Sequence, residues 1–390
     1  MKVANTKRIN EKILQIENIR QSLLMLNGTM TNQIASTCII PEALDAIKAE
    51  AVKIREHMDQ NNGKGYSVEQ ITMLLIVEAV ATQLMPGNAK IIDFYMNLIA
   101  PESKVFDSSE FKNNPYIKNI SFKNQKIGDY ELCNQSMAPY ELMIYNTPQN
   151  NTPFFISIPR IGCFTDEFSY PSIRQTSIES TWMSVTPNEV YTVQNAINNA
   201  KGKVLTLGCG MGYFAYMASL KDEVESITVV ELEQDVIDLF ESHILPQFEN
   251  KDKITVIKAD AIEYMKNLDD GEYDYCFADI WIGVEDMNAY FSVKEASRHI
   301  RKTKIDYWIE ESFAAYFLSY VWLELLKGVA KNNNIELPIM DSNLPEYELR
   351  RVNYIHRLMK NVEIIKPEDI DYYMNPRNII KLIGKSKISF

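Results

Sequence analysis

The chain has 390 residues, of which 46% are hydrophobic, and this is enough to bury a sizeable core in two or three domains. Its net charge of −12 disfavours a large nucleic-acid surface, because such surfaces depend on Lys and Arg that neutralise phosphates. We find no apolar segment typical of a secretory signal or a membrane span, and the five cysteines form no CxxC pair. We therefore expect a cytoplasmic globular protein that binds no metal, no nucleic acid and no membrane.

The first part of the chain has the pattern of a helical region. Apolar residues recur at helical spacing over 9–26 and again over 71–85. Ser67, followed three residues later by Gln70, forms a capping-box signature directly before the second of these runs. We expect a helical N-terminal domain over residues 1–125.

The next part and the tail are predicted from shorter signals. β-type runs at 141–145 and 154–157 are separated by Asn, Pro and Gln, which predicts a small β-rich segment over 126–185. A mainly helical C-terminal extension is expected over 331–390. The helical regions could form a lid, a dimer surface or a substrate-selecting domain, and a homo-oligomer formed through them stays open.

Strand-like and helix-like runs alternate between Gly202 and Glu310. This alternation predicts an α/β fold, with a parallel sheet covered by helices on both faces. We expect Tyr307–Glu310 to be a fifth strand, reached through a helix over 293–301. The α/β domain is placed over residues 186–330.

A glycine-rich turn follows the first strand of this domain. Residues 208–212 read Gly-Cys-Gly-Met-Gly and lead directly into a helical run. Glycines let the backbone approach a ligand where a β-carbon would collide, and the helix that follows offers unpaired N–H groups. A dinucleotide fingerprint needs Gly or Ala at its sixth position, where this chain has the bulky Tyr213. The turn therefore favours an adenosyl ligand without phosphates.

Acidic residues stand at the carboxyl ends of the next three strands. Glu231 is placed to accept hydrogen bonds from both ribose hydroxyls, and Leu232 to lie against adenine. Asp260 is placed to accept from the adenine amino group, and the Ala261 N–H to donate to a ring nitrogen. Asp279 ends the fourth strand. Because open α/β sheets bind ligands in the crevice at these strand ends, the positions predict one binding site.

These motifs resemble the class I S-adenosylmethionine-dependent methyltransferase family over about residues 186–310. The motifs are VLTLGCGMG, VVELEQDVI, KADAIEYM and YDYCFADIW. The resemblance implies a Rossmann-like parallel-sheet domain that binds S-adenosylmethionine, with Asp279 at the mouth of the substrate pocket. The residues expected at the cofactor are Gly208, Cys209, Gly210, Gly212, Glu231, Leu232, Asp260, Ala261 and Asp279.

Part of the same region is similar to the polyamine synthases, which are aminopropyltransferases of the spermidine and spermine synthase branch. The similarity lies in residues 229–237 and in Leu245-Pro246 after the predicted helix. Those enzymes carry an Asp-x-x-Asp pair after the fourth strand, whereas this chain has Asp279 followed by Ile-Trp-Ile. This similarity implies decarboxylated S-adenosylmethionine as an alternative cofactor.

Three functions stay open at this point. The leading expectation is methyl transfer from S-adenosylmethionine to a small molecule or metabolite, with Asp279 or Glu310 orienting or deprotonating the acceptor. The alternative is transfer of an aminopropyl or aminocarboxypropyl group from S-adenosylmethionine or its decarboxylated form. The third is a non-catalytic protein that keeps the fold, because Thr206 stands where the family often has an acid.

Overall fold

The computed structural model describes residues 1–36, 43–60, 65–150, 152–335 and 344–390, and the statements below concern these residues. Its central element is a five-stranded sheet in the order β11-β10-β9-β12-β13, in which every neighbouring pair is parallel. The strands are β9 (Gly202–Leu207), β10 (Val224–Glu231), β11 (Ile254–Lys258), β12 (Tyr275–Ala278) and β13 (Lys304–Tyr307). The strand order reverses at β9, which has β10 and β12 as neighbours. This reversal opens a ligand-binding crevice at the carboxyl end of β9.

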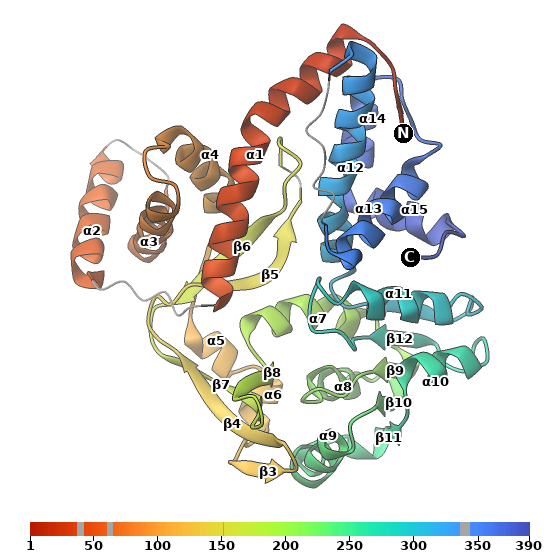
Figure 1. Cartoon of the computed structure of the whole chain (residues 1–390). Helices are drawn as coiled ribbons and strands as arrows, with labels where there is room; N and C mark the ends of the chain where they lie inside the picture. Colours follow the sequence, from red (N-terminus) through yellow and green to blue (C-terminus); the bar gives the residue numbers. More distant parts are fainter. Residues whose placement is uncertain (37–42, 61–64, 151, 336–343) are drawn as a thin grey trace.

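Helices cover both faces of the parallel sheet, and Figure 1 shows α8 and α10 on opposite sides of it. These helices are α7 (Pro187–Asn199), α8 (Tyr213–Ser219), α9 (Gln234–Leu239), α10 (Ala261–Asn267) and α11 (Met287–Ala296). The four residues of β12 and the last four of β9 are all buried, as is typical of strands covered on both faces. The predicted α/β, Rossmann-like fold is confirmed.

The N-terminal region is helical as predicted. Its main helices are α1 (Lys7–Ser36), α2 (Leu44–Gln60), α3 (Val68–Leu84) and α4 (Ala89–Ile99), and two short helices follow, α5 (Ser108–Lys112) and α6 (Pro115–Asn119). The capping box is present at the start of α3: the Gln70 N–H donates to the Ser67 hydroxyl, and the Ser67 N–H donates to the Gln70 side chain. Helix α1 extends beyond its predicted end.

Two small sheets contain the β-rich segment predicted over 126–185, and one of them also includes a strand at 104–106 from the region predicted to be helical. One has the order β3-β4-β7-β8 and is antiparallel, and the other has the order β2-β6-β5. Their strands are β2 (Lys104–Phe106), β3 (Gln125–Ile127), β4 (Tyr130–Met137), β5 (Met143–Gln149), β6 (Ile158–Phe164), β7 (Phe168–Gln175) and β8 (Ser180–Ser184). The strands β5 and β6 extend beside α1, so this segment joins the N-terminal helices to the parallel sheet (Figure 1).

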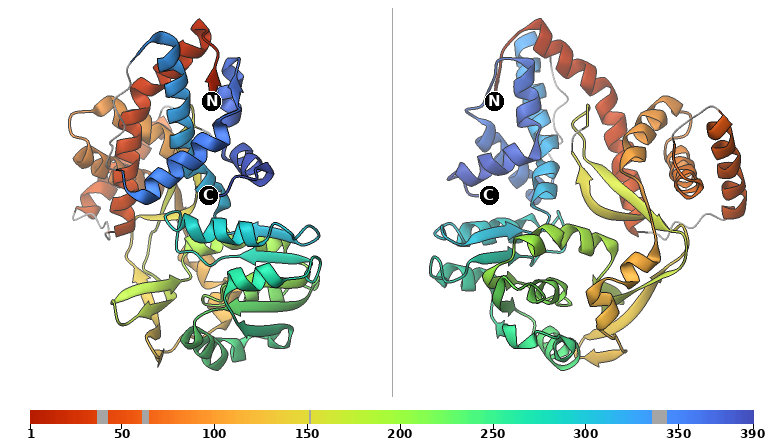
Figure 2. Two further views of the ribbon diagram at one scale, coloured as in Figure 1. Left: turned by 45° about the vertical axis from the view of Figure 1, so that its right-hand side comes forward. Right: turned by 180° about the vertical axis from the view of Figure 1, so that it is seen from behind.

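The C-terminal part is mainly helical. Its first helix, α12, contacts α1 near the start of α1, and the two helices then diverge, as the right-hand view of Figure 2 shows. The C-terminal part consists of α12 (Glu310–Asn333), α13 (Glu346–Met359), α14 (Pro367–Tyr373) and α15 (Pro376–Lys385), and a short parallel pair joins β1 (Lys2–Val3) to β14 (Glu363–Ile364). Among the described helices, only α12 is long and apolar enough to cross a membrane. Most of it is buried inside the protein.

The predicted boundaries near residue 300 are wrong by a few residues. The fifth strand was predicted over Tyr307–Glu310, but β13 is Lys304–Tyr307 and Glu310 begins α12. The chain leaves the sheet at Ile309, which has a left-handed backbone with φ 47°. The helix predicted over 293–301 is α11, which ends at Ala296.

Candidate active site

The glycine turn connects β9 to α8 and lies against the end of β12. Gly208 has φ +96°, and a β-carbon on it would lie 2.1 Å from the carbonyl oxygen of Asp279. The Asp279 N–H donates to the carbonyl of Leu207 over 2.9 Å. Gly212 has φ +72° and stands at the N-cap of α8, where a β-carbon would lie 2.3 Å from the Phe240 ring. Glycine therefore lets the ends of β9 and β12 approach each other at the crevice.

The Glu231 carboxylate holds the glycine turn in place. Its Oε2 accepts from the Cys209 N–H over 2.9 Å, and its Oε1 accepts from the N–H groups of Leu232 and Glu233 over 2.8 and 2.9 Å. Three of its roughly four acceptor positions are thus used within the protein. Sequence reasoning missed this structural role, and the binding of ribose by Glu231 stays a prediction.

Asp260 is the N-cap of α10. Its Oδ1 accepts from the N–H groups of Ile262 and Glu263 over 2.8 and 2.9 Å, which fixes the direction of the carboxylate. Asp260 and Ala261 line one cavity together with Leu232, which is 55% exposed. The structure thus brings together the three residues predicted at adenine, and it leaves an apolar side chain open for a flat ring to cover.

This cavity, which we call the strand-end cavity, has a volume of about 410 Å³ and lies at the carboxyl ends of four strands of the parallel sheet. Five acidic residues line it: Glu189, Glu231, Glu233, Asp260 and Asp279. Past the glycine turn a narrow recess of about 50 Å³ adjoins it and shares Glu189 and Asp279 as lining residues. In the described part of the chain, no Lys, Arg or His lines the cavity or the recess.

Glu189 and Asp279 form a carboxylate pair at this junction. Burial raises the pKa of Glu189 to about 7. Burial, and then repulsion by the Glu189 charge, raise the pKa of Asp279 well above its usual value. Two carboxyl groups in one poorly solvated site are not both ionised easily, so the pair holds at least one proton near neutral pH. No group of three His, Cys, Asp or Glu side chains among the described residues is placed to hold a metal ion.

Sequence reasoning missed Glu189. It lies in the first turn of α7, which precedes β9 in the chain, and no motif marks it. The packing of α7 brings it to the recess.

Three other residues near the site have packing contacts. The Cys209 side chain is buried, and burial raises the pKa of its thiol well above the usual value. The Trp281 indole N–H donates to the carbonyl of Trp308 over 3.2 Å, although its ring also lines the strand-end cavity. The Tyr213 hydroxyl accepts from the Asn114 side chain over 3.0 Å, so the start of α8 is tied to the N-terminal region.

The structure does not bring Glu310 to this site. Its Oε1 accepts from the Lys294 ammonium over 2.5 Å and from the Tyr290 hydroxyl over 2.8 Å. Glu310 begins α12 instead of ending a strand, and its carboxylate is directed toward α11. Among the described lining residues of the cavity and recess, Glu310 is absent. We therefore correct the assignment of Glu310 as a catalytic base, because its charge is already paired.

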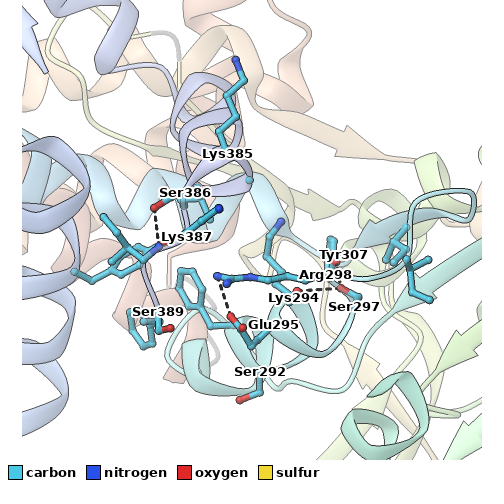
Figure 3. Close-up of a pocket in the computed structure, with 18 of the residues that line it drawn as sticks. Ser292, Lys294, Glu295, Ser297, Arg298, Tyr307, Lys385, Ser386, Lys387 and Ser389 are labelled. Carbon is cyan, nitrogen blue, oxygen red and sulfur yellow. Dashed lines mark hydrogen bonds and ion pairs between the residues drawn. The ribbon is translucent and has the colours of Figure 1, made fainter. Parts of the chain in front are cut away.

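A larger cavity, of about 880 Å³, lies between α11, α15 and the last residues of the chain (Figure 3). Lys294 and Arg298 line it, but Lys294 pairs with Glu310 and Arg298 pairs with Glu295. Neither the glycine turn nor any acid at the strand ends lines this cavity. The residues predicted at the cofactor therefore line the smaller strand-end cavity and not this one.

The strand order, the glycine turn and the acidic strand ends define a Rossmann-like domain of the class I S-adenosylmethionine-dependent transferase type. Residues 190–309 match the family model of the spermine/spermidine synthase domain. This match covers β9 to β13 and most of α7, and it confirms the resemblance read from the motifs. No curated protein sequence matches the chain.

Solved structures give distant matches. A spermidine synthase from Thermotoga maritima is 14% identical, with a TM-score of 0.27, and the match covers 40% of this chain and 60% of that protein. A spermidine synthase in complex with the transition-state analogue AdoDATO is 16% identical, with a TM-score of 0.27 and coverages of 40% and 59%. PigF with SAH is 17% identical, with a TM-score of 0.22 and coverages of 29% and 39%. The chain thus spans about three fifths of the length of the spermidine synthases that it matches.

Proposed function

We propose that the protein is an enzyme that transfers an aminopropyl group from decarboxylated S-adenosylmethionine to an amine. The observation that carries this proposal is the charge of the site: five acids line the strand-end cavity, and no Lys, Arg or His in the described lining offsets them. A cofactor with a sulfonium and a free ammonium, but no carboxylate, complements such a site. The match of residues 190–309 to the spermine/spermidine synthase domain supports the same choice.

The residues present fit the adenosyl part of this cofactor. Asp260, Ala261 and Leu232 line the adenine end, and Glu231 keeps one acceptor position for a ribose hydroxyl. Gly208 and Gly210 have no side chain, so a ligand can approach their backbone where the cavity adjoins the recess. The recess, with Glu189 and Asp279, then receives the aminopropyl tail.

When bound, the cofactor supplies a carbon that its sulfonium activates, so the protein itself needs no covalent intermediate. Glu189 and Asp279 have two tasks: the charged carboxylate attracts the tail ammonium, and the pair accepts the proton that the acceptor amine loses. The acceptor nitrogen forms its new bond to the propyl carbon as the carbon–sulfur bond breaks, and methylthioadenosine leaves with that electron pair. Trp281 and Trp308, which wall the cavity, keep water out.

Product analysis tests this proposal. The whole protein is incubated with decarboxylated S-adenosylmethionine or S-adenosylmethionine and a pool of amines, and the nucleoside products are identified by mass spectrometry. We expect methylthioadenosine from the decarboxylated cofactor. The Glu189→Gln variant should form it about 10²–10⁴-fold more slowly, whereas Glu225→Gln, at an exposed position of β10, should match the unchanged protein.

The other outcomes overturn the proposal. S-adenosylhomocysteine formed from S-adenosylmethionine would indicate methyl transfer, the leading expectation from sequence. The absence of both products with every amine would favour the non-catalytic alternative.

A further inference from the structure

A second cavity, which we call the α1–α12 chamber, lies between helix α1, the strand pair β5–β6 and helix α12, and has a volume of about 650 Å³. One face of α1 contributes residues at helical spacing, among them Arg20, Leu24 and Asn27. Side chains such as Leu142 and Leu318 make much of the remaining lining apolar. The volume is in the range of small-molecule sites.

The chamber and the strand-end cavity are separated by a shared wall. Helix α7 presents Asn188 and Thr192 to the chamber and Glu189 to the cavity and recess. Trp308 lines both spaces, and its indole N–H donates to the Thr192 hydroxyl over 2.9 Å. The chamber therefore borders, through the Trp308 side chain, the strand-end cavity that Glu189 and Asp279 also line.

Arg20 is the one cation in the described lining of the chamber. It is only 2% exposed, and its Nε makes no hydrogen bond within the described structure. The guanidinium packs over the Trp322 ring, 5.1 Å from its centroid. The charge of Glu17 attracts the Arg20 guanidinium. The Oε2 atom of Glu17, however, accepts its hydrogen bond from the Trp322 indole N–H, over 2.6 Å.

Such an arrangement is unfavourable without a further partner, because a buried charge needs pairing and hydrogen bonds. Burial lowers the pKa of Arg20 to about 10, yet the group stays charged at neutral pH. Asn27 lies about two turns further along the same face of α1, and its buried Oδ1 also makes no hydrogen bond to the described residues. Glu141, the other charged residue of the lining, already accepts the Ala138 N–H over 2.8 Å.

We propose that the α1–α12 chamber is the acceptor site and that it takes an amine with a carboxylate at its far end, of the amino-acid or ω-amino-acid type. The carboxylate pairs with Arg20, the apolar body fills the chamber, and the amine passes Trp308 to reach Glu189 and Asp279. This inference rests on the proposed function, and it names the acceptor class. Simple diamines are disfavoured, because their second ammonium would meet Arg20.

Matched acceptors test the inference with the whole protein and decarboxylated S-adenosylmethionine. The pairs are 4-aminobutyrate against 1,4-diaminobutane and 6-aminohexanoate against 1,6-diaminohexane, with methylthioadenosine release as the readout. We expect at least one amino carboxylate to exceed its diamine in kcat/KM by about 10-fold or more. Arg20→Met should abolish this preference, mainly by raising KM, whereas Arg174→Met, in an exposed ion pair on β7, should preserve it. A preference for the diamines in the unchanged protein, or a preference unaffected by Arg20→Met, overturns the inference.

Calorimetry separates this inference from the proposed function. Binding of 6-aminohexanoate and 4-aminobutyrate is measured with excess methylthioadenosine. 6-Aminohexanamide, which has a neutral amide in place of the carboxylate, serves as the control. Carboxylate-dependent binding supports the chamber assignment even when no turnover is found. This measurement uses only the unchanged protein, so it does not depend on the folding of a variant. Absence of binding by both amino carboxylates overturns the inference, whereas absence of methylthioadenosine release with every acceptor overturns the proposed function.

Discussion

The buried Glu189 carboxyl group should make the stability of the protein depend on pH. Burial raises its pKa from 4.5 to about 7 in the folded protein, so between these values the folded state binds more protons than the unfolded state. The free energy of unfolding therefore falls as the pH rises through this window. From pH 5 to pH 8 the loss due to Glu189 is roughly 2–3 kcal/mol. Glu189→Gln removes the titration, so the variant should lose less stability over this range.

Urea unfolding followed by tryptophan fluorescence at pH 5 and pH 8 measures this difference. The quantity to compare is the change in unfolding free energy between the two pH values, because the contributions of groups that do not interact with Glu189 cancel between the two proteins. Asp279 loses the repulsion of the Glu189 charge in the variant, so its shift in pKa becomes smaller and the pH dependence falls further. Glu225→Gln, at an exposed site, should change with pH as the unchanged protein does. The reasoning is refuted if Glu189→Gln shows the same pH dependence as the unchanged protein.

Further substitutions test other parts of the site. Glu231→Gln should lower the unfolding free energy by about 1–3 kcal/mol and weaken cofactor binding in calorimetry, because an amide cannot accept all three N–H groups. Gly208→Ala should abolish cofactor binding, because its β-carbon would collide with the Asp279 carbonyl. Gly28→Ala, in α1 with open space around it, should instead be neutral or stabilising by up to about 1 kcal/mol in thermal unfolding. Tyr213→Phe should lower the unfolding free energy by about 1 kcal/mol in urea unfolding, because it removes the hydrogen bond with Asn114.

The features that sequence predicted well have local causes. The capping box of Ser67 and Gln70 uses four consecutive residues, and the structure contains it as expected. The alternation of strands and helices likewise predicted the parallel sheet, because each run buries its own apolar face. The sheet also explains why Asp260 and Glu231 could be predicted to line one cavity, since the carboxyl ends of parallel strands meet at one edge.

The features that sequence missed depend on long-range packing. Glu189 reaches the recess because α7 packs beside the glycine turn, and Arg20 reaches the chamber because α1 contacts α12. Neither position has a neighbouring motif. Glu310 was misplaced because the strand ends at Tyr307, and this small shift moves its carboxylate onto a helix beside Lys294.

The relative affinity for the two forms of the cofactor tests the central claim most directly. The tail carboxylate of S-adenosylmethionine would meet Glu189 and Asp279 with no cation in the described lining to offset it. In isothermal titration calorimetry at neutral pH, the decarboxylated form should bind at least about 10-fold more tightly, a difference of about 1.4 kcal/mol. Equal or tighter binding of S-adenosylmethionine would contradict the account.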